Sequence, residues 1–168
     1  MSAVRLGRSS EGATIEAIEA LYRARFRAFL KVAAGVAGER HAADAVHDGF
    51  VRALRHRRLF RRSGSLEAWV WKTVINAARD ARRADRGDVG LDPAAEPAAN
   101  GHAVDDDVRA VIVALPRRQR LAVFLRYYAD LEYEAIAEIL DIAPGTVAAT
   151  LHKAHAAIRR RLQEDAHA

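Results

Sequence analysis

Apolar residues recur at steps of three and four positions along most of the chain, which is the spacing of one face of an α-helix. The first apolar stripe begins after Thr14, a residue type that caps helix starts, and ends between Gly35 and Gly38. A second stripe covers residues 42–54. A third covers residues 66–83 and is preceded by a serine that can cap it. The pattern therefore predicts three helices in the first half of the chain.

The periodicity disappears over residues 84–104, which contain turn-forming residues and few large apolar ones. Such a segment buries too little surface to offset its ordering entropy, so a flexible acidic linker is expected there. Residues 1–13 are expected to be disordered for the same reason. These limits divide the chain into a first domain over residues 14–83 and a second over residues 105–164.

The second domain is predicted to open at the acidic triplet 105–107, and Pro116 separates its first two helices. A short helix over residues 133–140, a three-residue turn over 141–143 and a longer helix from Pro144 then form a helix-turn-helix. The second helix of such a unit enters the DNA major groove by its N-terminal residues. An ordinary helical hairpin that binds no DNA is the alternative.

Composition narrows the class of protein. Apolar residues make up 51% of the 168 positions, and only ten glycines and four prolines occur, so an all-α fold is expected. There is no cysteine, which excludes disulfides and thiolate metal sites. No apolar run is long enough to span a bilayer and no secretory signal is evident, so a cytoplasmic protein without membrane insertion is expected. His152 and His155 have no obvious third ligand, and no catalytic constellation is present, so we expect no enzyme, no metal and no cofactor.

The net charge of +5 is unevenly distributed. Residues 20–83 carry a net charge of +10, residues 84–107 carry −6, and residues 108–168 carry +2. Basic blocks attract phosphate, so the distribution favours nucleic-acid binding by the first domain. The alternative is that these cations only solvate helix faces.

Residues 61–83 combine basic side chains, aromatic side chains and an asparagine in the middle of a predicted helix. Unpaired bases stack on aromatic rings while cations bind phosphates, so this segment is a candidate surface for single-stranded nucleic acid. Trp69 lies on the expected apolar stripe and is assigned to the core, whereas Trp71 faces elsewhere. The candidate residues are Arg61, Arg62, Ser63, Ser65, Trp71, Lys72, Asn76 and Arg79. The alternative is that both tryptophans are core residues and the arginines are solvated.

The chain as a whole resembles the extracytoplasmic-function (ECF) sigma factors of bacterial RNA polymerase. In the first domain the resemblance rests on the segment 42–50 and on Trp69-Val70, Asn76, Asp80 and Arg83. In the second domain it rests on Leu115-Pro116, Arg120, Leu125, Tyr127-Tyr128, the segment 133–140 and Gly145-Thr146-Val147. The order and spacing of these motifs are together specific to the family.

The resemblance implies a sigma region 2-like bundle of three to four helices and a sigma region 4-like helix-turn-helix domain of four. It implies a sigma factor that binds core RNA polymerase and promoter DNA, with an anti-sigma factor or other regulator as a further partner. Residues implied to dock on polymerase are Asp44, His47, Asp48 and Phe50. The loop 61–65 and Asn76 are implied to capture the melted minus-ten element. Residues implied to read the minus-thirty-five element are Thr146, Val147, Ala149, Thr150 and Lys153.

The chain departs from the family at the start of the last helix, where two usually basic positions are Ala148 and Thr150. Because a good base contact contributes about 1–3 kcal/mol, reading of the minus-thirty-five element is expected to be weak or moved to Lys153 and His155. Two alternatives remain from the sequence. One is a stand-alone helix-turn-helix transcription regulator, and the other is a sigma-like interaction protein with weakened DNA reading.

Overall fold

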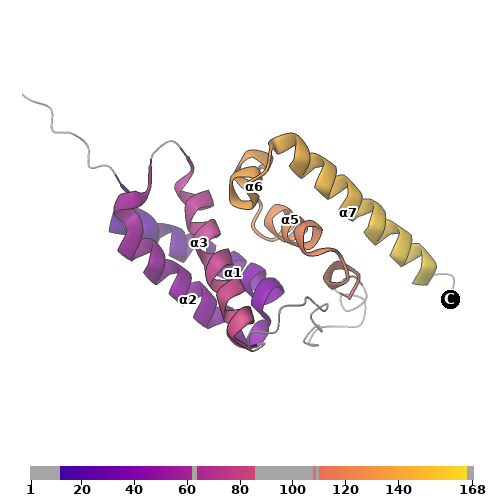
Figure 1. Ribbon diagram of the computed structural model, residues 1–168, viewed down its shortest axis with the longest axis horizontal. Coiled ribbons are helices and arrows are strands. Elements are labelled where there is room, and N and C mark those ends of the chain that lie inside the picture. The colour runs from indigo at the N-terminus through magenta and orange to yellow at the C-terminus, as the bar shows by residue number, and fades with distance from the viewer. Residues whose placement is uncertain (1–11, 62–63, 86–107, 109, 166–168) are drawn as a thin grey trace, which may run out of the picture.

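A computed structural model of the chain describes residues 12–61, 64–85, 108 and 110–165 (Figure 1). These residues form helices and turns only, which confirms the all-α prediction. The helices are α1 (Ile15–Ala37), α2 (Glu39–His56), the 3-10 helix η1 (Arg57–Leu59), α3 (Leu66–Asp85), α5 (Arg117–Tyr127), α6 (Tyr133–Leu140) and α7 (Pro144–Asp165). Among them, no helix has the length and apolar character that crossing a membrane requires.

Several predictions fall outside the described residues. These include the disordered N-terminus up to residue 11, the linker from residue 86 onwards and the acidic helix start at 105–107. Arg62 and Ser63 of the candidate surface also lie outside them. These expectations stay predictions.

The ends of α1 are set by the residues that the sequence pattern selects. The Thr14 hydroxyl oxygen accepts a hydrogen bond from the Ala17 N–H at 3.1 Å, which caps the first turn. The helix ends at Gly38, whose φ of 89° is open to glycine but not to larger residues. Its N–H donates to the Ala34 carbonyl at 2.8 Å. The same glycine precedes α2, so it turns the chain directly from one helix into the next.

Helices α1, α2 and α3 form a bundle around an aromatic core. Phe29 of α1 is fully buried between Phe50 of α2 and Trp71 of α3, with ring centroids 4.9 and 3.9 Å away respectively. Tyr22 adds an edge-to-face contact to Phe50 at 4.8 Å. The core therefore joins all three helices, and it fixes which face of α3 is turned outward.

The buried face of α3 includes one residue that the sequence pattern does not place there. The selection of Trp71 as an exposed candidate is wrong because Trp71 has no exposed area, whereas Trp69 is half-buried and packs against the edge of the core. Positions 69 and 71 are about 200° apart around the helix, so only Trp71 points to the centre of the bundle. Both faces carry apolar residues, which leaves the pattern ambiguous. The residues that face the bundle are Val70, Trp71, Val74, Ile75 and Ala78.

Helices α5, α6 and α7 pack around Leu125, Ile136, Val147 and Leu151, which are buried almost completely. Asp141 ends α6 in the left-handed conformation with a φ of 56°, and the Ile142 N–H donates to the Ala137 carbonyl at 3.0 Å. Helix α7 then starts at Pro144. The short helix, the three-residue turn and the long helix confirm the predicted helix-turn-helix.

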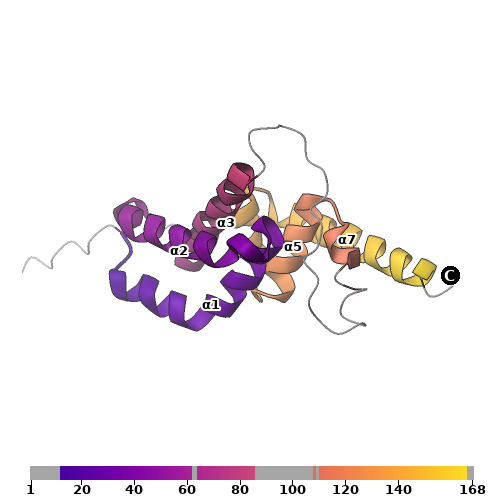
Figure 2. The same cartoon turned by 90° about the horizontal axis from the view of Figure 1, so that it is seen from below.

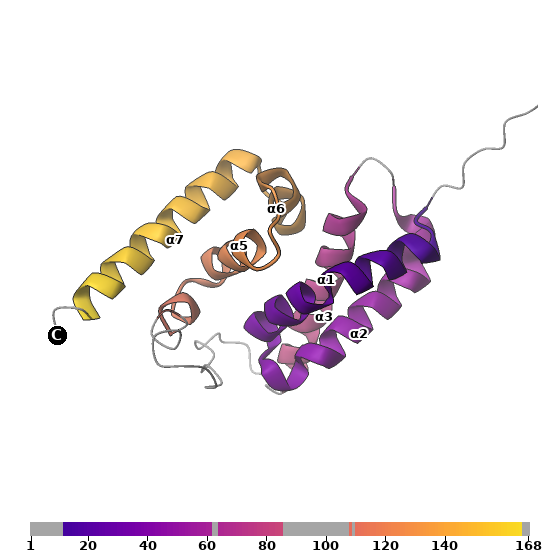
Figure 3. The ribbon, with the colours of Figure 1, turned by 180° about the vertical axis from the view of Figure 1, so that it is seen from behind.

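The two domains contact each other. Helices α5 and α6 lie between the first bundle and α7 (Figures 1 and 3), and α7 extends away from that bundle (Figure 2). Gly35 of α1 lies against the ring of Phe124 of α5, where a Cβ atom would overlap the ring. The Lys31 amino group lies 5.2 Å from the ring centroid of Tyr128. Further along the interface, α6 packs against α3.

Candidate nucleic-acid and polymerase interfaces

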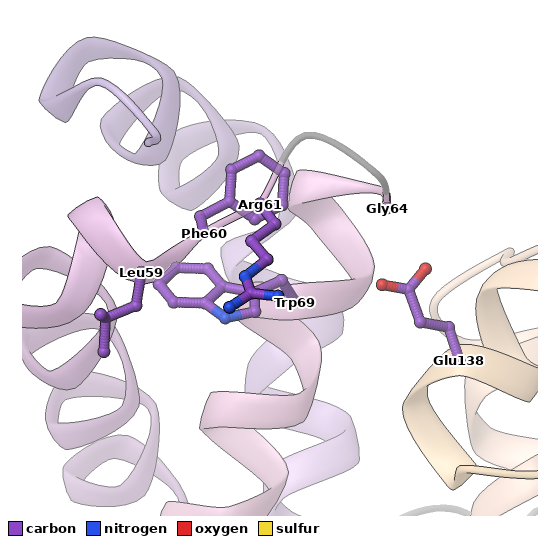
Figure 4. A pocket seen from close by; sticks show the side chains of 6 residues that line it. All are labelled: Leu59, Phe60, Arg61, Gly64, Trp69 and Glu138. Atoms are coloured by element: carbon purple, nitrogen blue, oxygen red, sulfur yellow. The ribbon is translucent and has the colours of Figure 1, made fainter. Parts of the chain in front are cut away.

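A cavity of about 540 Å³ lies where the chain passes from η1 to α3 (Figure 4). Phe60 and Trp69 form an aromatic wall, with ring centroids 5.6 Å apart. Leu59, which is 70% exposed, and Arg61 line it as well. Glu138 reaches the cavity from α6 in the other domain. The cavity thus offers aromatic surface and a cation at the start of α3.

A stripe of side chains extends from this cavity along the outer face of α3. Trp69, Lys72, Asn76 and Arg79 follow one another at steps of three and four residues, which places them on one side of the helix. Lys72 and Asn76 are exposed, and Arg79 is half-buried. The structure therefore brings these predicted residues together, but with Trp69 in the place that the sequence pattern gives to Trp71. We call these four residues the α3 stripe.

Ser65 and Arg61 lie at the cavity end of the α3 stripe. The Ser65 hydroxyl oxygen accepts a hydrogen bond from the Ala68 N–H at 3.3 Å, so it caps α3 as the sequence predicts. Periodicity does not select Leu59 or Phe60 because neither belongs to a long helix. The signal that could have found them is an apolar pair inserted between arginines at a helix boundary.

Arg79 is a half-buried cation at the far end of the α3 stripe. Its Nε atom is buried and has no hydrogen-bond partner within the described residues. Burial lowers the pKa of the Arg79 guanidinium, and the nearby charges of Arg117 and Arg83 lower it further. Arg117 belongs to α5, so the positive charges of the two domains repel each other here. An anion at this place would relieve the repulsion between them.

Trp71 cannot contact nucleic acid in this structure, and its selection as a candidate is wrong. Its ring stacks on Phe29 in the core, and its indole N–H donates to a Glu67 carboxylate oxygen at 3.5 Å. Trp71 is therefore a packing residue of the bundle.

Helix α7 presents Thr146, Ala149 and Lys153 on one exposed face, as the helix-turn-helix prediction requires. Val147 and Thr150 were selected with them, but the structure turns both inward. Val147 is fully buried, and the Thr150 hydroxyl donates to the Thr146 carbonyl at 2.7 Å while 8% of the residue is exposed. Only a part of the predicted reading face is thus available to DNA.

The residues expected to dock on polymerase lie on α2. Asp44 and His47 are exposed, and Asp48 is half-buried. Phe50 is 5% exposed and packs between Tyr22 and Phe29, so its selection as a surface contact is wrong. A phenylalanine four residues after other apolar positions on a helix belongs to its buried face.

Arg52 connects this surface to α3. It pairs with Asp48 at 2.6 Å and with Asp80 at 2.7 Å. Its hydrogen bond is the main cause that lowers the pKa of the Asp80 carboxyl, with the charges of Arg52 and Arg83 acting in the same direction. The same bonds raise the pKa of Arg52. Asp80 therefore holds α2 and α3 together.

Two family models match the two halves of this architecture. The model described as Sigma-70 region 2 matches residues 18–87, which include α2, α3 and the first-domain side of the cavity. The model described as Sigma-70, region 4 matches residues 105–158, which include the helix-turn-helix. The matched segments correspond to the two helical domains.

Curated relatives show the same relationship over both domains. The ECF RNA polymerase sigma-E factor of Haemophilus influenzae is 27% identical over 139 residues, which are 71% of this chain and 74% of the relative. The ECF RNA polymerase sigma-E factor of Escherichia coli (strain K12) is 27% identical over 139 residues, with 71% and 73% covered.

Two solved structures share the fold. The sigma factor RpoE, solved with the anti-sigma factor NepR from Bartonella quintana, has a TM-score of 0.67 at 22% identity, covering 89% of this chain and 98% of that one. CnrH, solved with the cytosolic domain of CnrY, has a TM-score of 0.70 at 20% identity, covering 91% and 92%.

Proposed function

We propose, from the premise that this chain belongs to the ECF sigma factors and initiates transcription with RNA polymerase, that its first domain captures the melted minus-ten element and its second domain reads the minus-thirty-five element. Sigma factors are not enzymes, and the polymerase supplies the catalysis. The observation that carries the proposal is the α3 stripe, which leads from an aromatic cavity past an exposed asparagine to a half-buried arginine whose Nε atom has no hydrogen-bond partner among the described residues. A stand-alone regulator would leave this surface without a task.

The cavity and the α3 stripe suit a single strand better than a duplex. A base that leaves the helical stack can lie against the Phe60–Trp69 wall, since stacking on aromatic side chains replaces stacking on neighbouring bases. The Asn76 amide offers a donor and an acceptor for the next base edge. Lys72 and Arg79 supply positive charge for the phosphates that connect these bases.

The second domain supports duplex reading with few contacts. Thr146, Ala149 and Lys153 are the predicted positions that α7 exposes, and Lys153 is the only cation among them. We therefore propose that recognition of the minus-thirty-five element is weak and that the first domain determines much of the promoter choice.

Asp44, His47 and Asp48 are the proposed contacts with core polymerase. We also propose an anti-sigma factor as a regulator, because both solved relatives form complexes with such partners or with a cytosolic domain. The proposed domain limits are residues 14–83 and 105–164, and the proposed place of action is the cytoplasm.

The direct test is run-off transcription with core polymerase on fragmented genomic DNA, followed by sequencing of the transcripts. Defined start sites are expected. On one of these promoters, Asn76→Ala should reduce strand opening about fivefold or more, because a good base contact contributes about 1–3 kcal/mol. Polymerase binding should be unchanged. An equal loss of opening and of polymerase binding would contradict the role proposed for Asn76.

A further inference from the structure

Glu138 joins the second domain to the cavity of the first. It is an exposed residue of α6, and its side chain points across the domain boundary toward Gly64 (Figure 4). One carboxylate oxygen accepts a long hydrogen bond of 3.5 Å from the Ser65 N–H. The other lies where a Cβ atom on Gly64 would come within 2.5 Å of it. The carboxylate thus lies directly against the backbone at the start of α3.

This position overlaps with the one that nucleic acid would need. The Ser65 N–H precedes the first turn of α3, where unpaired donors attract anionic groups. A carboxylate and a phosphate compete for such a donor. Glu138 is also a wall of the cavity, so a base entering beside Phe60 and Trp69 would meet α6.

The second domain also lies near the other end of the α3 stripe. The charge of Arg117 of α5 lowers the pKa of Arg79, and this like-charge repulsion opposes the domain contact. Three contacts favour the closed arrangement of the domains: the packing of Gly35 on Phe124, the Lys31–Tyr128 contact and the Glu138 hydrogen bond. The domain contact therefore combines favourable packing with one like-charge repulsion.

We propose that Glu138 is an autoinhibitory latch that keeps α6 over the cavity of the free chain, so that single-stranded DNA can bind only after the second domain moves away. This inference rests on the proposed function, because it requires the cavity and the α3 stripe to be the DNA surface. It assigns Glu138 a task in the free chain that is separate from reading DNA with α7.

Direct binding of single-stranded DNA tests the latch. The probe is a fluorescent oligonucleotide with the minus-ten strand of a promoter mapped by run-off transcription. Glu138→Ala in the full chain should bind it about two- to tenfold more tightly than the unchanged protein, since the variant removes the acceptor and one hydrogen bond contributes about 0.5–1.5 kcal/mol. Glu134→Ala is the matched control, because Glu134 is exposed on the same helix one turn earlier. It removes the same charge, so general electrostatic effects cancel. Equal affinities of the two variants would overturn the latch.

A second test closes the domains without changing the cavity. The chain has no cysteine, so the variant Lys31→Cys/Tyr128→Cys has thiols only at the α1–α5 contact. A short bis-maleimide with a cleavable disulfide should join them in the free protein. With core polymerase, the crosslinked chain should open the promoter at least about tenfold less than the same sample after cleavage.

The outcomes separate the two proposals. Equal promoter opening before and after cleavage overturns the latch but leaves the proposed function intact. A cleaved sample that opens no promoter contradicts the proposed function, and with it the latch. Failure to crosslink in the free chain contradicts the closed arrangement on which the latch depends.

Discussion

Gly35 of α1 packs directly against the ring of Phe124 of α5, and this contact joins the two domains. Any side chain at position 35 would overlap the ring, so glycine is needed for the close approach. Gly35 also lies inside a 23-residue helix, where glycine is unfavourable relative to alanine. The chain therefore carries a locally weak residue at the place where its domains meet.

Gly35→Ala should separate these two effects. We expect the free energy of unfolding of the first domain, measured with denaturant, to rise by about 0.5–1 kcal/mol because alanine favours the helix. We also expect a larger radius of gyration by small-angle X-ray scattering, because the added methyl group pushes Phe124 away. Gly38→Ala is the control. Its positive φ should cost about 1–3 kcal/mol without changing the radius. An unchanged radius for Gly35→Ala would contradict the role of this contact.

The helices follow from signals that lie close together in the sequence. Thr14, Ser65 and Pro116 mark helix starts correctly, because caps act within one turn. Interior orientation is harder to predict. Trp71 is buried although the pattern places it off the apolar stripe, because both phases of α3 contain apolar residues and the partner helices decide between them.

Some features of the site could not be predicted from local pattern at all. Arg82 and Arg120 are buried, although arginines usually indicate solvent-exposed positions. Arg82 donates a hydrogen bond to the Val36 carbonyl, and Arg120 donates one to the Val113 carbonyl. Glu138 reaches the cavity from 73 positions away in the sequence. Such contacts depend on how whole helices pack, and no periodicity within one helix encodes that.

Reversing the charge of Arg117 should strengthen the domain contact, because it converts repulsion with Arg79 into attraction. We expect Arg117→Glu and Arg118→Glu both to weaken binding of a single-stranded minus-ten oligonucleotide. The affinity of the Arg117→Glu variant should be about two- to fivefold lower than that of the Arg118→Glu variant. Arg118 is an adjacent exposed arginine, so its reversal controls for net charge. The expected range follows from the modest 0.2–1 kcal/mol of partly exposed ion pairs. Equal weakening by both variants, measured by fluorescence anisotropy, would show that only net charge matters.

Asp80 should stabilise the first domain in a pH-dependent manner. Its folded-state pKa lies below the usual 3.8, so its stabilising contribution is complete above the unfolded-state pKa and is lost as the pH falls through the folded value. Asp80→Asn should therefore lower the free energy of unfolding by about 0.2–1 kcal/mol at neutral pH, the range for partly exposed ion pairs. The difference from the unchanged protein should disappear below the folded-state pKa. Urea unfolding of both proteins, measured from neutral pH to below the folded-state pKa of Asp80, tests this difference in stability.

The two family-basic positions of α7 should respond differently to added charge. Ala148 is exposed, so Ala148→Lys should increase transcription that depends on the minus-thirty-five element, by about fivefold or more for one good contact. Thr150 is 8% exposed and bonded to the Thr146 carbonyl, so Thr150→Arg should destabilise the domain and give no such gain. Transcription from promoters with and without the element separates recognition from stability. A gain from Thr150→Arg would contradict the orientation of α7.

The two tryptophans should separate DNA capture from folding. Trp69→Ala is expected to reduce promoter opening about fivefold or more, because base stacking on an aromatic wall contributes about 1–3 kcal/mol, with a smaller loss of stability than Trp71→Ala because Trp69 is only half-buried. Trp71→Ala should instead destabilise the first bundle by about 3–5 kcal/mol, because it leaves a large cavity beside Phe29.

Since the chain contains only these two tryptophans, Trp71→Phe makes Trp69 the single tryptophan that can report on binding. Its emission should change when the minus-ten oligonucleotide is added in excess to the chain without polymerase, whose own tryptophans would mask the signal. Trp69→Phe leaves only the buried Trp71, whose emission should stay constant. A response from Trp71 alone would place the DNA surface on the opposite face of α3.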